Sequence, residues 1–386
     1  MNLLDRPAAL WAETFQEKGE AAYRGRQVAH WLFKRQVTDP AAMTNIPPST
    51  RGLLENDLSL AIPALESVHQ SADGTRKIAL RLSDGPVIES VLIPRKDRMT
   101  LCLSTQAGCG IGCRFCRTAA MGLIRNLMPS EILGQWVQAM RYLSASPGET
   151  KEGPLIDHIV FMGMGEPLAN LDALVPAIRS LTHPDGIGLS PRRITVSTSG
   201  LVPKMALLGE ANLGIQLAVS LCAPDDLLRR EIMPVGRIYS IAEILEACRR
   251  FPLRNRERVT FEYVLLRGKN DAPEQARALG RLLAPFRSKV NLIPFNPFPQ
   301  SGLKRSPSHR IVVFAQILMD AGFITTVRKT RGDDIDAACG QLAGDVQDRT
   351  SRKLSRLGGH VVASSQPIIP ILADAVSPGN RSSNLI

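Results

Sequence analysis

Three of the seven cysteines stand in one short stretch, GCGIGCRFCRTA, as Cys109, Cys113 and Cys116. Their spacing is C-x3-C-x2-C, and no fourth cysteine or histidine lies close by in the sequence. Thiolates bind zinc and iron–sulfur clusters, but a structural zinc site normally has four protein ligands. Three thiolates therefore favour a 4Fe-4S cluster in which one iron keeps an open coordination position for another molecule.

Alternating strand and helix patterns must position this cysteine stretch. From about residue 99, strand-like runs such as MTLCLST and RRITVST alternate with helical runs such as PSEILGQWVQAMRYL. Repeated βα units predict an α/β fold with a parallel sheet, here a partial (βα)6 barrel of the TIM type. Barrel enzymes carry their chemistry on the loops after the strands, and the cysteine stretch occupies the first such loop. The motifs GMGEP, STSG, SLCAP and NPFP follow later strands.

The chain is predicted to divide into four parts. Residues 1–75 hold helical patterns, such as GRQVAHWLFKR, and are predicted to form a small N-terminal accessory domain. Residues 76–98 hold short β-like runs and form a predicted connector. The barrel with a C-terminal cysteine loop takes residues 99–348. Residues 349–386 are a basic segment with a tail rich in Ser, Pro and Asn, which predicts disorder.

Composition favours a cytoplasmic protein with an anionic partner. No apolar stretch approaches bilayer length, the N-terminus lacks the regions of a secretory signal, and the cysteine usage suits a reducing compartment. The net charge of +11 favours nucleic acid, although a merely basic enzyme is an equal alternative from charge alone. Aromatic residues make up only 5%, so phosphate recognition of a folded RNA fits better than base stacking along a single strand. The basic residues are grouped, for example as Arg249, Arg250 and Arg254, and as Arg328, Lys329 and Arg331.

Several strings in order resemble one family, the radical S-adenosylmethionine (SAM) RNA adenine-C2 methyltransferases of the RlmN type, with their C8-methylating relatives of the Cfr type. The strings are LCLSTQAGCGIGCRFCRTA, FMGMGEPLAN, RRITVSTSG, AVSLCAP, RVTFEYVLLRGKND, NLIPFNPFP and RKTRGDDIDAACGQLAG. The resemblance spans roughly residues 20–350. Because many independent motifs occur in the right order, it is much more specific than a lone cysteine triplet would be.

The resemblance implies a cofactor set and the residues that hold it. Cys109, Cys113 and Cys116 would hold a 4Fe-4S cluster whose open iron binds SAM. Gly165 and Glu166 would contact the amino group and methionine moiety of SAM, because a carboxylate accepts ammonium hydrogen bonds. Alone, G-x-G-E-P is more often a plain tight turn. Further SAM contacts are implied for Ser197, Ser220, Leu221, Cys222 and Asn296.

The implied chemistry depends on a lone cysteine, Cys339, in the stretch GDDIDAACGQL. Such a cysteine is usually a small buried hydrophobic residue. By resemblance, one SAM methylates Cys339, and a second SAM is cleaved at the cluster to generate a carbon radical on that methyl group. The radical adds to an adenine ring carbon. Cys102 would then attack the Cys339 sulfur, form a disulfide and release methylated RNA, as thiol exchange permits.

Two further positions carry open questions. By resemblance, Glu89 in VIESVLIP matches a carboxylate that would accept the proton from the target carbon. The alternative is an exposed strand residue without a catalytic role. Cys222 stands where the family usually has histidine. This departure puts in doubt a hydrogen bond to the bound cofactor, and it leaves open a shifted substrate preference.

The sequence thus predicts a methyltransferase acting on C2 of one adenine in 23S ribosomal RNA, and on the adenine beside the anticodon in some transfer RNAs. We expect a monomer served by a flavodoxin- or ferredoxin-type electron donor, with no membrane partner. A C8 methyltransferase of the Cfr type, a radical SAM enzyme acting on a small molecule and a non-enzymatic, metal-dependent RNA-binding protein remain as alternatives.

Overall fold

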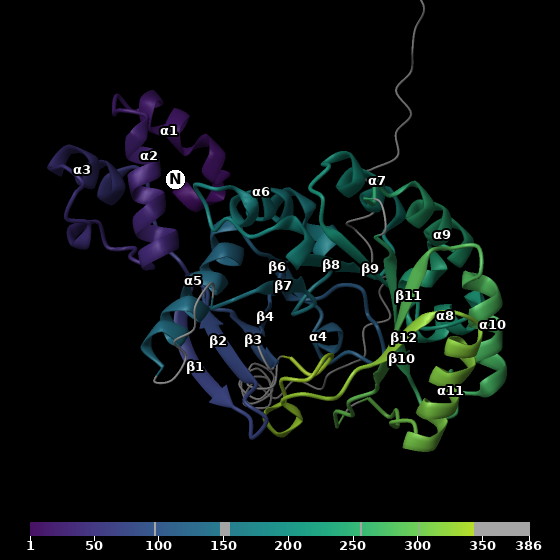
Figure 1. Ribbon diagram of the computed structural model, residues 1–386. Helices are drawn as coiled ribbons and strands as arrows, with labels where there is room; N and C mark the ends of the chain where they lie inside the picture. The colour runs from purple at the N-terminus through teal and green to yellow at the C-terminus, as the bar shows by residue number, and fades with distance from the viewer. Residues whose placement is uncertain (96–97, 147–154, 255–256, 300, 343–386) are drawn as a thin grey trace, which may run out of the picture.

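The computed structural model describes residues 1–95, 98–146, 155–254, 257–299 and 301–342. Within them, a sheet of ten strands forms the centre of the molecule in the order β1-β2-β3-β4-β7-β8-β9-β10-β11-β12 (Figure 1). From β4 onward each strand pairs in parallel with the next. These parallel strands are β4 (Arg98–Cys102), β7 (His158–Phe161), β8 (Ile194–Thr198), β9 (Gln216–Ser220), β10 (Val259–Leu265), β11 (Ser288–Pro294) and β12 (Ile324–Val327).

Helices follow these strands and cover the outer, convex side of the curved sheet (Figure 1). They are α5 (Pro129–Ala145), α6 (Leu171–Thr182), α7 (Val202–Glu210), α8 (Asp226–Ile232), α9 (Ile241–Arg250), α10 (Pro273–Leu283) and α11 (Ser308–Asp320). Helix α9 shows why they form there: Ser240 and Glu243 close a capping box, and Ile241, Ile244 and Leu245 are buried on one face. The predicted partial (βα)6 barrel is confirmed, with β12 as a further parallel strand at its edge.

Three antiparallel strands extend the sheet beyond β4. They are β1 (Ala64–Gln70), β2 (Arg76–Arg81) and β3 (Val87–Arg95). Strand β3 pairs with β4 so that Val91 lies opposite Cys102. Because β1 begins at Ala64, the sheet starts inside the range 1–75 that was predicted to be helical. The proposed division into domains remains a prediction, and residues 349–386 lie outside the described residues.

The N-terminal helices α1 (Trp11–Glu17), α2 (Tyr23–Ala29) and α3 (Pro48–Asn56) form a separate group beside α5 (Figure 1). Aromatic side chains join the group to the barrel, because the Trp11 and Phe33 rings stack 5.5 Å apart and Phe33 meets Trp136 of α5 at 6.4 Å. No helix among the described residues is long and apolar enough to span a bilayer.

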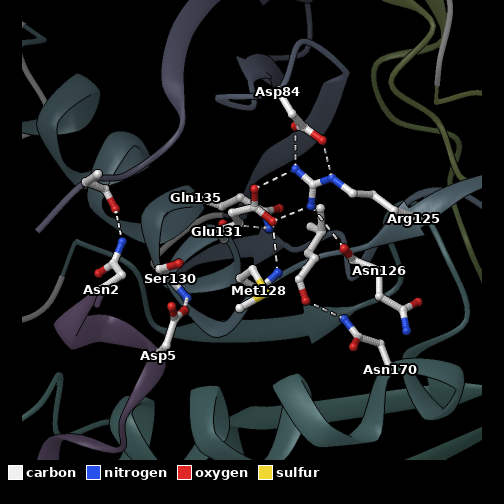
Figure 2. A network of polar contacts seen from close by, with 12 residues as sticks. Asn2, Asp5, Asp84, Arg125, Asn126, Met128, Ser130, Glu131, Gln135 and Asn170 are labelled. Carbon is white, nitrogen blue, oxygen red and sulfur yellow. Dashed lines mark hydrogen bonds and ion pairs between the residues drawn. The ribbon is translucent and has the colours of Figure 1, made fainter. Parts of the chain in front are cut away.

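A small hairpin of β5 (Gln106–Gly108) and β6 (Leu123–Asn126) encloses the cysteine stretch, together with the short helix α4 (Arg117–Ala120). The two strands approach so closely that a Cβ on Gly108 would lie 2.0 Å from the Gly122 carbonyl oxygen. Within the hairpin, Arg125 of β6 binds Asp84 through two hydrogen bonds of 2.6 Å and Glu131 through bonds of 2.7 and 2.8 Å (Figure 2). This clamp ties the hairpin to the β2–β3 turn and to the start of α5.

Candidate active site

The three clustered cysteines line one pocket at the carboxyl ends of the barrel strands. Backbone hydrogen bonds shape the loop that carries them: the Cys109 amide donates to Gly122, and the Cys116 amide donates to Cys113. Burial raises the pKa of the Cys109 thiol to about 12. Burial also raises the pKa of Cys113, and the nearby Cys116 and Cys109 sulfurs raise it further. The loop therefore brings the three thiols together, and a bound cation would be needed to hold them as thiolates.

The pocket fits an iron–sulfur cluster by the chemistry of its donors. All three cysteines are free thiols. Among the described residues, no three Cys, His, Asp or Glu side chains are arranged to hold a single metal ion. In a 4Fe-4S cluster each thiolate binds a different iron, so its three sulfurs stand farther apart than the ligands of one ion. Three free thiols on one pocket wall are the donor set that such a cluster takes.

Glu166 lies in the same pocket and is held by backbone amides. Its carboxylate accepts hydrogen bonds from Ser199 at 2.7 Å and from Leu168 at 3.1 Å. Burial raises the pKa of this carboxyl, and the amide bonds oppose the shift. The preceding Gly165 has a φ of +100°, and a Cβ there would lie 2.5 Å from the Gln106 Cβ. Glycine thus lets the chain turn so that Glu166 faces the pocket, with carboxylate lone pairs left for a ligand.

The other predicted SAM contacts fall into two groups. Ser197, Ser220 and Asn296 line the pocket, as expected for residues at or just after the ends of β8, β9 and β11. Leu221 and Cys222 are fully buried and do not line it. The Cys222 sulfur donates to the Glu262 carbonyl at 3.8 Å, so the thiol faces protein backbone rather than the pocket.

Cys339 lies where two spaces meet. It lines the cysteine pocket, and it also lines a cavity of about 810 Å³ inside the barrel, which we call the barrel cavity. Its neighbours hold the local backbone in place: Asn296 donates to the Cys339 carbonyl at 3.0 Å, and the Arg117 amide donates to the Gly340 carbonyl at 2.7 Å. Arg117 also pairs with Asp336 at 3.0 Å.

Residues 331–342, here called the Cys339 segment, cross from the end of β12 to the β1–β2 turn. The Gly332 amide donates to Asp73 at 3.3 Å, and the Ala72 amide donates to Asp334 at 3.2 Å. Since β12 is one edge of the sheet, this segment covers part of the open side of the barrel. It then returns to the interior, which places Cys339 against the cysteine loop.

Cys102 faces the barrel cavity from β4 and is buried. Burial raises the pKa of its thiol to about 12, the nearby Cys339 adds to the shift, and Arg328 opposes it. All seven cysteines are free, so the predicted disulfide between Cys102 and Cys339 is not present in this structure. Both sulfurs nevertheless line the same cavity, as a resolving pair requires.

Glu89, like Leu221 and Cys222, is a predicted site residue that lines neither space. It is 1% exposed, and Lys77 of β2 lies 3.1 Å from its carboxylate. It stands two residues before Val91 of β3, on the same side of the strand, and Val91 does line the barrel cavity. The alternative expectation, that Glu89 is an exposed strand residue, is wrong. The catalytic role of Glu89 stays a prediction.

Sequence reasoning missed two charged residues beside Cys339. Arg328 continues the inward-facing positions of β12, lines both spaces together with Cys339, and donates to the Met162 sulfur at 3.7 Å. Glu262 of β10 also lines both, and it accepts a hydrogen bond of 2.6 Å from Asn291. Burial raises the pKa of Glu262, and Arg328 lowers it. The only available signal was a charged residue at an inward position of an apolar strand.

Comparisons with known proteins agree with this geometry. Residues 103–279 match the model of the Radical SAM superfamily, and residues 1–60 match the ribosomal RNA large subunit methyltransferase N-terminal domain. The chain is 43% identical to a radical SAM methyltransferase from Sphaerobacter thermophilus, with a TM-score of 0.83 over 89% of this chain and 99% of that one. A domain of the pyruvate-formate lyase-activating enzyme from Bacteroides vulgatus is 18% identical, with a TM-score of 0.34 over 45% of this chain and 99% of that one, too distant to support an argument.

Proposed function

The chain belongs to the radical SAM methyltransferases of the RlmN type, and from this premise we propose that it methylates C2 of one adenine in 23S ribosomal RNA. The adenine beside the anticodon of some transfer RNAs is a second proposed substrate. The matched N-terminal domain is named for enzymes that act on large-subunit ribosomal RNA, and the basic composition suits an RNA substrate.

The observation that carries the proposal is the position of Cys339. This sulfur lines both the cysteine pocket, where SAM would bind, and the barrel cavity, which has room for a nucleoside. A cysteine that carries a methyl group from SAM to RNA must reach both molecules. A purely structural cysteine has no need of either space.

When bound at the three cysteines, the cluster and two successive SAM molecules would supply first a methyl group and then the radical that activates it. The chain's own residues bind and orient the reactants. Glu166 and Gly165 would hold the amino end of SAM, beside Ser197 and Ser220. Cys339 must lose its thiol proton to become a nucleophile; burial raises its pKa, and the positive charge of the nearby Arg328 lowers it.

Cys102 would release the product. Its thiolate would attack the Cys339 sulfur, so that the S–S bond forms as the sulfur–carbon bond to the RNA-bound methylene breaks. The electron pair of that bond stays on the carbon, which takes up a proton and becomes the methyl group. Glu89 is the proposed acceptor of the proton from the target carbon, and the unpaired electron of the RNA adduct would return to the cluster before Cys102 attacks. Because Lys77 pairs with Glu89, the bound RNA would have to open this pair.

An anaerobic assay tests the proposal directly. Reconstituted protein, SAM, a reductant and a ribosomal RNA fragment should yield methyladenine together with 5′-deoxyadenosine. Nucleoside chromatography then separates the C2 product from the C8 product of a Cfr-type enzyme. A protein that binds RNA and a metal but forms neither product would support the non-enzymatic alternative. We also propose a flavodoxin- or ferredoxin-type electron donor, a monomer and a cytoplasmic location, where thiols stay reduced.

A further inference from the structure

The barrel cavity runs toward the amino ends of the strands, away from the cysteine loop. Arg98, His158 and Lys289 are the first or second residues of β4, β7 and β11, and all three line this cavity. Cys102, which also lines it, ends β4 and marks its deeper part. Barrel enzymes ordinarily receive substrates at the carboxyl ends of the strands, so a cavity that reaches the other end calls for its own explanation.

The cavity lining toward that end is positively charged. We call the cationic lining residues there the cationic rim; they are Arg95, Arg98 and Lys289. All three side chains are exposed. Among the described residues that line the cavity, Glu262 is the only carboxylate, and it lies in the deep part beside Arg328.

The positive charge around this end of the cavity affects the pKa of His158. Burial lowers the pKa of this histidine, and Arg193 and Arg98 lower it further, while Asp157 opposes the shift. Asp157 does not line the cavity; it accepts a hydrogen bond from the Met99 amide and lies 3.8 Å from Arg193. The end of the cavity is therefore a site of positive potential that favours an anionic ligand.

The opposite end is occupied by protein. The Cys339 segment and α4 are joined by the Arg117–Gly340 backbone bond and by the Thr118 hydroxyl, which donates to the Leu342 carbonyl at 3.1 Å. These contacts place a loop and a short helix beside the cysteine pocket. A nucleotide that entered there would have to displace both to reach Cys102.

We propose that RNA enters through the cationic rim, at the amino ends of the barrel strands. The rim would bind the phosphates on either side of one extruded adenine, while the base extends through the cavity toward Cys339. Threonine hydroxyls at Thr100, Thr195 and Thr260 line the path that the base would take. This inference rests on the proposed function and adds the direction from which the substrate arrives.

Charge reversal tests the rim. Lys289→Glu and Arg95→Glu should each weaken binding of the ribosomal RNA fragment by about tenfold or more and flatten the salt dependence by about one phosphate contact. Arg281→Glu, on the exposed side of α10, changes the net charge equally and should leave binding unchanged. Methylation of Cys339 by SAM without RNA, measured from the intact mass, should stay normal in all three.

The outcomes separate this inference from the proposed function. If the wild type methylates RNA and the rim variants bind it with wild-type affinity at every salt concentration, the rim is not the entrance. If the wild type neither binds nor methylates RNA, the proposed function is lost and the inference with it.

A second experiment tests from which end of the barrel the RNA enters. A photo-crosslinking residue at Ile324, which is 46% exposed and lines the cavity, should form a covalent product with bound RNA. The same residue at Leu227, which is 82% exposed at the start of α8, should not, because it follows β9 at the cysteine-loop end. Crosslinking from Leu227 but not from Ile324 would reverse the proposed direction.

Discussion

The β5–β6 hairpin and the Cys339 segment both bring cysteines to the same pocket, but they are held in different ways. The hairpin itself carries the half-buried guanidinium of Arg125, which donates hydrogen bonds to two carboxylates. The Cys339 segment is held by separate single contacts, among them the Arg117–Asp336 pair at 3.0 Å. A partly exposed ion pair with a single contact contributes little, whereas bidentate arginine contacts add both energy and geometry.

The difference fits the two tasks that we propose. Ligands of a cluster must keep one geometry, so the loop that carries them benefits from a rigid support. The Cys339 sulfur must approach SAM, then the adenine, and then Cys102, so its segment benefits from contacts that exchange at low cost. The following predictions would break or sharpen this comparison.

The largest effect should come from the sulfur itself. Cys339→Ala should abolish methyladenine formation while the protein still takes up iron and sulfide, because Cys339 carries the methyl group but is not a proposed ligand of the cluster. Cys248→Ala, at a buried position on α9, is the matched control and should keep its activity. Methyladenine from the Cys339 variant, measured by nucleoside chromatography, would refute the carrier role.

Removal of the Arg125 clamp should have the next largest effect. Arg125→Ala leaves Glu131 without its guanidinium, and we expect a loss of about 1–3 kcal/mol in the free energy of unfolding, with reduced iron uptake. Arg125→Lys keeps the charge but not the bidentate geometry and should recover only part of the loss. Calorimetry and iron content provide the two measurements. If iron uptake in Arg125→Ala equals that of the wild type, the hairpin does not depend on the clamp.

Arg328 should control the reactivity of the Cys339 thiol. Burial raises the pKa of Cys339 and Arg328 lowers it, so the SAM-dependent methylation rate should rise with pH. Arg328→Gln removes the cation, raises the pKa further and moves the profile to higher pH, with about a tenfold slower rate near neutral pH for each unit of pKa change. Intact-mass kinetics over a pH series would show this shift. A profile unchanged by the substitution would mean that Arg328 acts on something other than the thiol.

The sequence predicted the elements of this site better than the pairings among them. The parallel strands, the cysteine stretch and GMGEP follow from spacing and alternation, and the structure places Glu166 and the three cysteines in one pocket. The Lys77–Glu89 pair could not be predicted, because it depends on how β2 and β3 lie side by side. The position of Arg328 could not be predicted for the same reason. From charge alone, the sequence grouped Arg328 with Lys329 and Arg331 as RNA contacts. Only the register of β12 shows that its side chain faces inward.

The smallest effect should come from the Arg117–Asp336 pair, and it tests the comparison most closely. Asp336→Ala removes a partly exposed ion pair, so the free energy of unfolding should change by no more than about 0.2–1 kcal/mol, and iron uptake should stay normal. The rate of RNA methylation should nevertheless change, because this pair joins the Cys339 segment to α4, directly after the cluster cysteines. Glu246→Ala removes an ion-pair network on α9 whose carboxylate is 41% exposed, and it should change neither stability nor the rate of RNA methylation. If Asp336→Ala lowers stability and iron uptake as much as Arg125→Ala does, the two regions are one rigid unit, and the low-cost exchange proposed for the Cys339 segment is wrong.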